Sequence, residues 1–564
     1  LKRILTNYLK MEQANKVQPN NFENERLAIS DRRRNDGDLV GALTVLLNIE
    51  EEGTKNINVL SKIAAIYFDM ELFVLSSEYW FKYMSQSNSP RVRLRAYSGL
   101  SACFCMLGDT RLMAYYSEKQ LALGPSGEQE YDSVLLDYYD YVYDAVGDGY
   151  YVSYPEKYIS PKRLMFEADA LIEARKDMEA AERLSFIQKD SEYYCEARSK
   201  MAQCYLVSGK DEEAEKILAD LVAEFPDNNF ANLSYGLFLL DDEKTEDAEK
   251  YLIRAIKGDF YDEEDYFRLA VALCRVEKDS EALFVLEKAL EINEYCLHVL
   301  FLTALISHNL GDDEKASALF KKVYSLTRGA VSRYYYGLTE KGDYKEKLEY
   351  TFNLPKNEAA KRFAKITLII ANGKKAIASY GESEVMELLD WCLPYVTKLQ
   401  FEFVEVLLTQ GTLKLKNHVI GKLISPTVSN EIKIFIIETL VMRDSSKRIS
   451  VAFDNVFIKI PLLKGDFEKT RNDFFKRAYA FSFARLCPFG TDTHALRDTA
   501  YKMYYKFKDS GYLKKISDVN ALGCAMAIES GFKMKDKLMY EAFFQTKKSS
   551  VDAILNAYHE EDGE

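Results

Sequence analysis

A chain of 564 residues, 48% of them hydrophobic, is too long for one small domain and too apolar for a disordered protein, so we expect several packed units. The net charge of −13 is uneven, because residues 411–550 hold 25 lysines and arginines against 14 aspartates and glutamates, which leaves −24 for the rest. This polarity is compatible with a nucleic-acid surface, and equally with a basic part that binds an acidic partner or the chain's own acidic part.

Residues 1–22 are expected to form an N-terminal helical arm. They carry positive charge but lack the apolar stretch of roughly 7 to 15 residues that an export signal contains. Elsewhere the longest apolar runs, such as 366–371 and 432–437, are much shorter than the roughly 20 residues of a membrane span. We therefore expect a cytoplasmic protein with no membrane partner, in which the nine cysteines are buried thiols.

Residues 23–127 are expected to form degenerate helical repeats. Ala42 and Ser76 are small residues that are each followed, four positions later, by a large apolar one, Leu46 and Trp80 respectively. A third copy is expected around Gly99, Gly108 and Ala114. A fixed period of about 34 residues, as between Ala42 and Ser76, is typical of stacked helical hairpins.

Residues 128–160 interrupt the repeat with an acidic stretch that contains nine tyrosines. The alternating pattern of residues 150–154 predicts a short strand on the surface of the repeats. Acidic, tyrosine-rich stretches can bind basic partners, but linkers are poor in aromatic residues and aromatic loops usually pack on their own scaffold. We expect packing rather than a free binding segment.

Residues 161–354 contain the repeat in its most regular form, with equally spaced alanines at positions 214, 248, 282 and 316. Twelve positions before each of these alanines stands another alanine or a glycine. Small side chains at both places allow two antiparallel helices to approach closely. The pattern therefore predicts four buried pairs, Ala202 with Ala214, Gly236 with Ala248, Ala270 with Ala282 and Ala304 with Ala316. The preceding helices hold Ala181 in the alanine place, and a shortened copy is expected at 342–350.

The segment 198–226 resembles a tetratricopeptide repeat through Met201, Ala202, Tyr205, Gly209, Ala214, Leu218, Leu221 and Pro226. The resemblance implies a right-handed superhelical solenoid whose concave wall is formed by the first helix of each pair and holds a peptide or a helix. Some members of the family clamp the carboxylate tail of heat-shock chaperones with a set of Lys, Asn and Arg. That set is absent from this sequence.

The expected peptide-binding groove consists of outward positions on the first helices: Phe230, Leu233, Leu237, Phe267, Arg275, His298, Phe301 and Leu305. Since Phe and Leu dominate, a client would be held by apolar burial, worth about 1.5 to 3 kcal/mol for each fully buried side chain. Five of these residues should form a contiguous apolar strip, covered by a client or by part of this chain. The alternative is that they pack against neighbouring helices.

Residues 355–465 keep helical patterning without this period. Within them, 448–462 contains two β-rich runs around Asp454 and Asn455, which predicts a hairpin. Because an isolated hairpin is marginal in water, residues 150–154 are a candidate third strand. The expected fold is therefore all-α, a tetratricopeptide-type solenoid followed by an irregular helical region with one small β-hairpin.

Residues 466–564 are expected to form a basic helical domain with helices near 466–487, 492–510, 517–530, 535–544 and 549–560. Five helices with this spacing resemble a cyclin-type repeat of B-type general transcription factors. The last helix would be a recognition helix, but it ends in His559, Glu560, Glu561 and Asp562, which would repel phosphates. Only Lys547 and Lys548 could contact a nucleic-acid backbone, so structural helices are expected.

No nucleotide-binding, hydrolase or metal-binding motif occurs in the sequence, so neither an enzyme nor a cofactor is expected. The leading hypothesis is an interaction scaffold or adaptor that binds a protein or peptide client on the concave surface. The alternative is a nucleic-acid-associated regulator that uses the basic C-terminal part. Clustering of the basic residues on one exposed face would favour the alternative.

Overall fold

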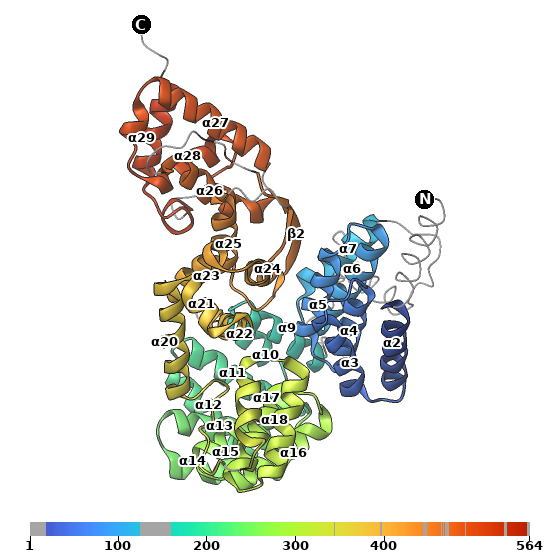
Figure 1. Ribbon diagram of the computed structural model, residues 1–564. Coiled ribbons are helices and arrows are strands. Elements are labelled where there is room, and N and C mark those ends of the chain that lie inside the picture. The colour runs from blue at the N-terminus through green and yellow to red at the C-terminus, as the bar shows by residue number, and fades with distance from the viewer. Residues whose placement is uncertain are drawn as a thin grey trace, which may run out of the picture. The chain divides into compact units, whose positions relative to one another are not determined.

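The computed structural model describes residues 19–123, 160–342, 344–394, 398–443, 448–463, 465, 467, 473–490, 492–534 and 539–560 (Figure 1). These residues form helices and one two-stranded sheet, as expected for an all-α protein with one hairpin. They divide into two compact units. The first unit comprises Leu1–Ser76 and Tyr97–Pro355, and the second comprises Ser77–Ala96 and Lys356–Glu564.

The first helices in the chain are α2 (Pro19–Asn35), α3 (Leu39–Glu51), α4 (Asn58–Asp69), α5 (Phe73–Ser85), α6 (Pro90–Met106) and α7 (Thr110–Ala122). The helices from α9 to α14 are α9 (Pro161–Glu173), α10 (Asp177–Ser185), α11 (Tyr194–Val207), α12 (Asp211–Glu224), α13 (Asn229–Asp241) and α14 (Thr245–Ala255). The first unit ends with α15 (Glu263–Arg275), α16 (Asp279–Ile292), α17 (Leu297–Asn309), α18 (Asp313–Thr327) and α19 (Ala330–Thr339).

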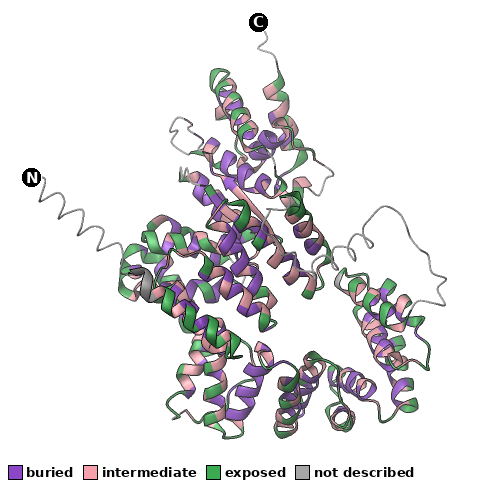
Figure 2. Ribbon diagram, turned by 90° about the vertical axis from the view of Figure 1, so that its right-hand side faces the viewer, coloured by how far each residue is buried: buried purple, intermediate pink, exposed green. Residues whose placement is uncertain are grey.

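The predicted array is confirmed as four helix pairs, α11 with α12, α13 with α14, α15 with α16 and α17 with α18. All seven alanines of the predicted contacts are fully buried. At Gly236 an added Cβ would lie 2.7 Å from Cδ2 of Leu252, so only glycine fits there without a shift. Figure 2 shows the buried residues as stripes along the helices, with exposed residues on their opposite sides.

The degenerate repeats before residue 123 keep the same twelve-residue contact, with serines in place of alanines. The Ser30 hydroxyl donates to the Ala42 carbonyl oxygen at 3.0 Å, and the Ser76 hydroxyl donates to that of Ala64 at 2.8 Å. In the third copy Ser101 donates to Met113 at 3.2 Å. The expected positions Gly99 and Ala114 are only half-buried, so this copy is shifted from the predicted place.

The shortened repeat expected at 342–350 is wrong. Beyond α19 the described chain contains no helix until α20, and residues 344–354, which we name the strap, are non-helical. The tyrosine-rich insert and the proposed third strand at 150–154 lie outside the described residues.

Contacts within the first unit join its earliest helices to the end of the array. The Tyr67 hydroxyl on α4 donates to the Leu326 carbonyl oxygen of α18 at 2.8 Å. Arg328, which caps α18 with φ 51°, donates from Nη2 to Oδ1 of Asn48 on α3 at 3.2 Å. Its Nε is 3.8 Å from Glu51. Residues 280 positions apart in the chain are therefore neighbours.

The second unit begins its main part with α20 (Lys356–Asn372), α21 (Lys374–Tyr380), α22 (Glu382–Cys392), α23 (Lys398–Gln410), α24 (Leu413–Gly421), η2 (Lys422–Ile424) and α25 (Asn430–Met442). A hairpin of β1 (Arg448–Phe453) and β2 (Val456–Pro461) follows. The remaining elements are α26 (Phe474–Leu486), η3 (Cys487–Phe489), α27 (Thr493–Asp509), η4 (Tyr512–Lys514), α28 (Val519–Glu529), the π-helical turn η5 (Met539–Phe543) and α29 (Lys548–His559).

The predicted hairpin is confirmed as an antiparallel pair in which Phe453 faces Val456. Asp454 and Asn455 form its turn with φ values of 45° and 62°, as a two-residue hairpin loop requires. Residues 77–96 support it, because the Phe81 ring stacks on Phe457 at 6.1 Å between centroids. Of the five C-terminal helices expected, the first begins only at Phe474, and the one expected at 535–544 is a single π-helical turn in its described part.

Candidate functional site

The first helices of the array form one continuous row. Helix α11 contacts α13, and α13 contacts α15. The rings of Phe267 on α15 and His298 on α17 meet edge to face at 4.5 Å between centroids, which extends the row to α17. This row, which we name the wall, is the surface on which the sequence places the groove.

Several residues expected to line the groove are not available on it. Leu233 and Leu305 are 1% and 0% exposed and belong to the helical core. Phe301 is also buried, with its ring 5.3 Å from that of Phe320 and 5.2 Å from that of Tyr335. For these three residues the expected strip is wrong, and the alternative of packing against neighbouring helices holds.

The polar residues of the expected groove bind neighbouring repeats. Arg275 is exposed, but its Nη1 lies 3.1 Å from the Asp241 carboxylate and its Nη2 donates to the Leu240 carbonyl oxygen at 3.0 Å. His298 has Nε2 3.3 Å from the Glu264 carboxylate. Hydrogen bonds with Cys296 and with Glu264 raise the pKa of His298 to about 10.

The strap covers part of the wall. Its Phe352 ring lies 5.8 Å from the ring of Phe267 and 5.6 Å from that of Phe301, between α15 and α17. Leu348 and Leu354 of the strap are buried. The part of the chain that covers these phenylalanines is thus the strap.

Side chains of α17 and α19 bind the main chain of the strap. Asn309, at the end of α17, donates from Nδ2 to the Leu348 carbonyl oxygen at 2.9 Å and accepts from the Leu348 amide at 2.7 Å. The ring of His308 bonds the Glu346 carbonyl oxygen through Nε2 at 3.0 Å, and the Tyr335 hydroxyl donates to that of Asn353 at 3.0 Å. These bonds are made to the main chain, so they do not depend on which side chains the strap carries at these positions.

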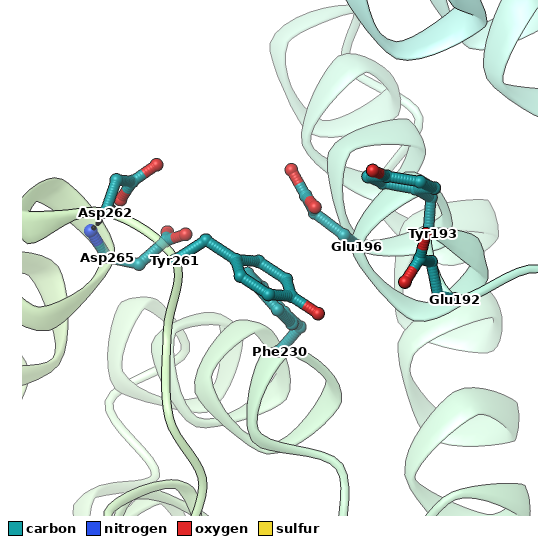
Figure 3. A pocket seen from close by; sticks show the side chains of 7 residues that line it. All are labelled: Glu192, Tyr193, Glu196, Phe230, Tyr261, Asp262 and Asp265. Carbon is teal, nitrogen blue, oxygen red and sulfur yellow. Dashed lines mark hydrogen bonds between the residues drawn. The ribbon is translucent and has the colours of Figure 1, made fainter. Parts of the chain in front are cut away.

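A pocket of about 250 Å³ lies on the wall before the strap, between α11, α13 and the start of α15. Its lining consists of Glu192, Tyr193, Glu196, Phe230, Tyr261, Asp262 and Asp265. In Figure 3 Glu196 and Tyr193 face Tyr261 and Phe230 across the opening. The rings of Phe230 and Tyr261 are stacked at 6.1 Å between centroids, and Tyr261 is 72% exposed.

The pocket carries more negative than positive charge. Lys200 lies 3.2 Å from Glu196 but also 2.8 Å from Asp169, and Arg268 lies 3.1 Å from Asp265. Burial, and then the neighbouring Asp262 carboxylate, raise the pKa of Asp265 to about 6. These two cations therefore leave the carboxylates of the pocket only partly neutralised.

The groove expected from the sequence includes Phe230 of the pocket. Tyr193 and Tyr261 lie in the loops that precede α11 and α15. The helical period does not predict which way a side chain in a loop points. Asp262 could have been found, because it caps α15 through the Asp265 amide at 3.0 Å, and Asn228 caps α13 one repeat period earlier. The period that locates the helices thus also locates the residues at their first turns.

The basic residues of the second unit are partly used inside it. Lys433 is buried and donates to the Ala452 carbonyl oxygen at 2.6 Å, and Lys459 donates to that of Ser87 at 3.0 Å. Arg485 lies 3.3 Å from the Glu438 carboxylate. Lys433 and Arg485 are therefore engaged inside the unit, and Lys459 is bound beside the hairpin.

Two kinds of feature are absent from the described part of the chain. No group of three or more His, Cys, Asp or Glu side chains there is arranged to hold a metal ion. In the same residues no helix combines the length and the hydropathy that a membrane span requires.

One repeat of the chain matches a known family. Residues 196–228 match the family model of the tetratricopeptide repeat, which agrees with the repeat found at 198–226 and with the helix pair α11 and α12. This segment is thus a tetratricopeptide repeat, and it stands within an array of similar helix pairs. No curated protein sequence matches it.

Solved structures similar to parts of this chain include other repeat proteins. MamA from Desulfovibrio magneticus RS-1 is 17% identical, with 30% of this chain and 95% of MamA covered and a TM-score of 0.23. A tetratricopeptide repeat protein from Parabacteroides merdae is 14% identical over 53% of this chain and 98% of its own, with a TM-score of 0.23. The TPR2AB domain of yeast Sti1, in complex with an HSP90 peptide, is 14% identical over 54% and 98%, with a TM-score of 0.19.

Proposed function

We propose that the chain is a protein-interaction scaffold that binds an extended segment of a client protein along the part of the wall formed by α11, α13 and the start of α15. An adaptor role in the cytoplasm is part of this proposal. The observation that carries it is the strap, because the same row of first helices already holds a non-helical segment through main-chain hydrogen bonds and aromatic contacts. An extended segment of a client can use the adjoining part of the wall in the same way.

The client is expected to make contacts with Phe230, Leu237 and the residues of the pocket. Phe230 and Leu237 are half-buried, so part of each side chain remains open to a ligand. Burial of the part of each side chain that is still exposed would contribute less to the binding free energy than the roughly 1.5 to 3 kcal/mol of full burial. Several such contacts would therefore be needed for stable binding.

Site-specific photo-crosslinking tests the proposal. A photoreactive phenylalanine derivative replaces Leu237 on the wall, and in a control replaces Phe284, which is 50% exposed on the second helix α16. We expect discrete protein adducts in an extract of the source cells at Leu237 and not at Phe284, with the crosslinked peptide mapping to a non-globular segment of the client.

Two results would contradict the proposal. Equal adducts at both positions would indicate unspecific contact with the acidic array. Adducts to nucleic acid instead of protein at Leu237 would favour the alternative, a nucleic-acid-associated regulator.

A further inference from the structure

We propose that the pocket between α11, α13 and α15 binds a lysine or arginine side chain, so that the client segment is basic. This inference rests on the proposed function, because it assumes that an extended client lies on the wall. It adds the chemistry by which the client is selected.

The lining of the pocket combines the two groups that bind cations in proteins. Glu192, Glu196, Asp262 and Asp265 supply carboxylates, and the stacked pair of Phe230 and Tyr261 supplies an aromatic face. A cation over such a face is attracted by the ring quadrupole, and a nearby carboxylate adds charge-assisted hydrogen bonds. An uncharged apolar side chain would gain only the aromatic contact and would desolvate the carboxylates without compensation.

The chain's own cations do not complete the site. Lys200 is divided between Glu196 and Asp169, and Arg268 pairs with Asp265. Among the described residues, no lysine, arginine or histidine lies within ion-pair distance of Glu192 or Asp262. The excess of carboxylate therefore favours an added cation, and Coulomb attraction within a half-enclosed pocket is stronger than on an open surface.

The size and place of the pocket favour a single side chain of an extended segment. Its volume of about 250 Å³ is smaller than the roughly 300 to 1,000 Å³ of small-molecule sites. It lies on the same wall as the strap, one repeat nearer the N-terminus than the pair of Phe267 and Phe301 that receives Phe352. A client main chain running along the wall would pass its opening.

Selection from a random library of displayed 12-residue peptides tests the inference with the intact chain at physiological salt. We compare the wild type with E192Q/E196Q in the pocket and with the matched control E213Q/E246Q, whose glutamates are exposed on the second helices α12 and α14. Lysine and arginine should be enriched by the wild type and by the control, and not by the pocket variant.

A synthetic copy of a selected peptide then gives the magnitude by fluorescence anisotropy. Replacing its selected arginine by citrulline, or its lysine by norleucine, should weaken binding to the wild type about tenfold or more and change binding to E192Q/E196Q little. The variant Y261L should weaken binding by about 3- to 10-fold, as the loss of a cation–aromatic contact predicts.

The outcomes separate this inference from the proposed function. Apolar or acidic peptides selected by the wild type would overturn the cationic pocket and leave the scaffold standing. Basic enrichment that survives in E192Q/E196Q would place cation binding elsewhere on the acidic array and overturn the inference. Failure to select any peptide would count against both.

Discussion

Lys433 on α25 is a charged side chain in the interior of the second unit. It is 2% exposed, and its Nζ donates to the Ala452 carbonyl oxygen in β1 at 2.6 Å. Burial lowers the pKa of Lys433 to about 8, against an ordinary value of 10.5. The unfolded chain therefore takes up the proton more readily than the folded protein does, and the charge of Lys433 costs stability at neutral pH.

The variant Lys433→Met should raise the free energy of unfolding at neutral pH by about 1 to 2 kcal/mol. The full shift in pKa would correspond to about 3 kcal/mol, and the lost bond to Ala452 offsets part of it. Because its pKa is lowered in the folded protein, Lys433 destabilises the wild type less as the pH rises from about 8 to about 10.5. The difference in unfolding free energy between the variant and the wild type should therefore become smaller over that range. Urea unfolding at several pH values measures this.

The exposed control Lys414→Met should show no such dependence on pH. A Lys433→Met variant that is less stable than the wild type at neutral pH would mean that the bond to Ala452 outweighs the cost of burying the charge.

Single residues were predictable where a period fixed their neighbours. Ala248 and Gly236 were placed at a helix contact because the repeat period, together with the fixed spacing within each helix pair, leaves few other packings. Leu233 and Leu305 were misplaced, since a helix inside an array is covered on more than one side and its apolar stripe is wider than one face. Tyr261 was missed because it lies in a loop.

At the scale of the element, the strap is where the sequence pattern predicted the wrong structure, a shortened helical repeat. Its sequence has the acidic and basic residues of a surface helix, yet the chain here is irregular, with bends at residues 346, 350, 352 and 353. Asn309 satisfies both the amide and the carbonyl group of Leu348, so the segment does not need helical hydrogen bonds. A tertiary contact of this kind leaves no periodic trace in the sequence.

The variant Phe352→Ser should loosen the strap while the array stays folded. It removes the ring contacts with Phe267 and Phe301, worth about 1 to 2 kcal/mol together, from a segment that contains no helix. Hydrogen exchange of residues 344–354 should accelerate about 5- to 30-fold.

Exchange in α11 to α14 should be unchanged in Phe352→Ser, and the exposed control Phe284→Ser should leave the strap unaffected. Protection of the strap equal to that of the wild type would show that Asn309, His308 and Tyr335 hold it without the phenylalanine.

At the scale of the whole molecule, the contact between α18 and the helices α3 and α4 changes how the first unit should unfold. An open repeat array interacts through nearest neighbours and can lose its terminal pairs one at a time. Here the bonds of Arg328 and Tyr67 tie the earliest repeats to the last pair of the array. We therefore expect these parts to unfold together.

The double variant Tyr67→Phe/Arg328→Gln should separate their unfolding. In hydrogen exchange under increasing urea, α3 and α4 should open at lower urea than α17 in the variant and at the same urea in the wild type. The control Arg254→Gln, on the exposed side of α14, should behave like the wild type. Coincident opening in the double variant would mean that other contacts link the two parts.

The molecular scale was also the least accessible to sequence reasoning. The repeat period indicated the repeat architecture, and the expected boundary near residue 354 lies beside the division at Pro355. The period contains no information on which distant segments meet, so neither the contact of Asn48 with Arg328 nor the membership of residues 77–96 in the second unit could be foreseen.

The membership of residues 77–96 in the second unit has a practical consequence for dissecting this protein. A fragment that starts at Lys356 lacks Phe81, the stacking partner of Phe457, and also lacks the Ser87 and Asn88 oxygens that accept from Lys459. Expression of residues 356–564 alone would thus expose an apolar face of the hairpin and favour aggregation. Grafting residues 77–96 through a flexible tether onto the start of 356–564 would return these partners and give the second unit a complete core of its own.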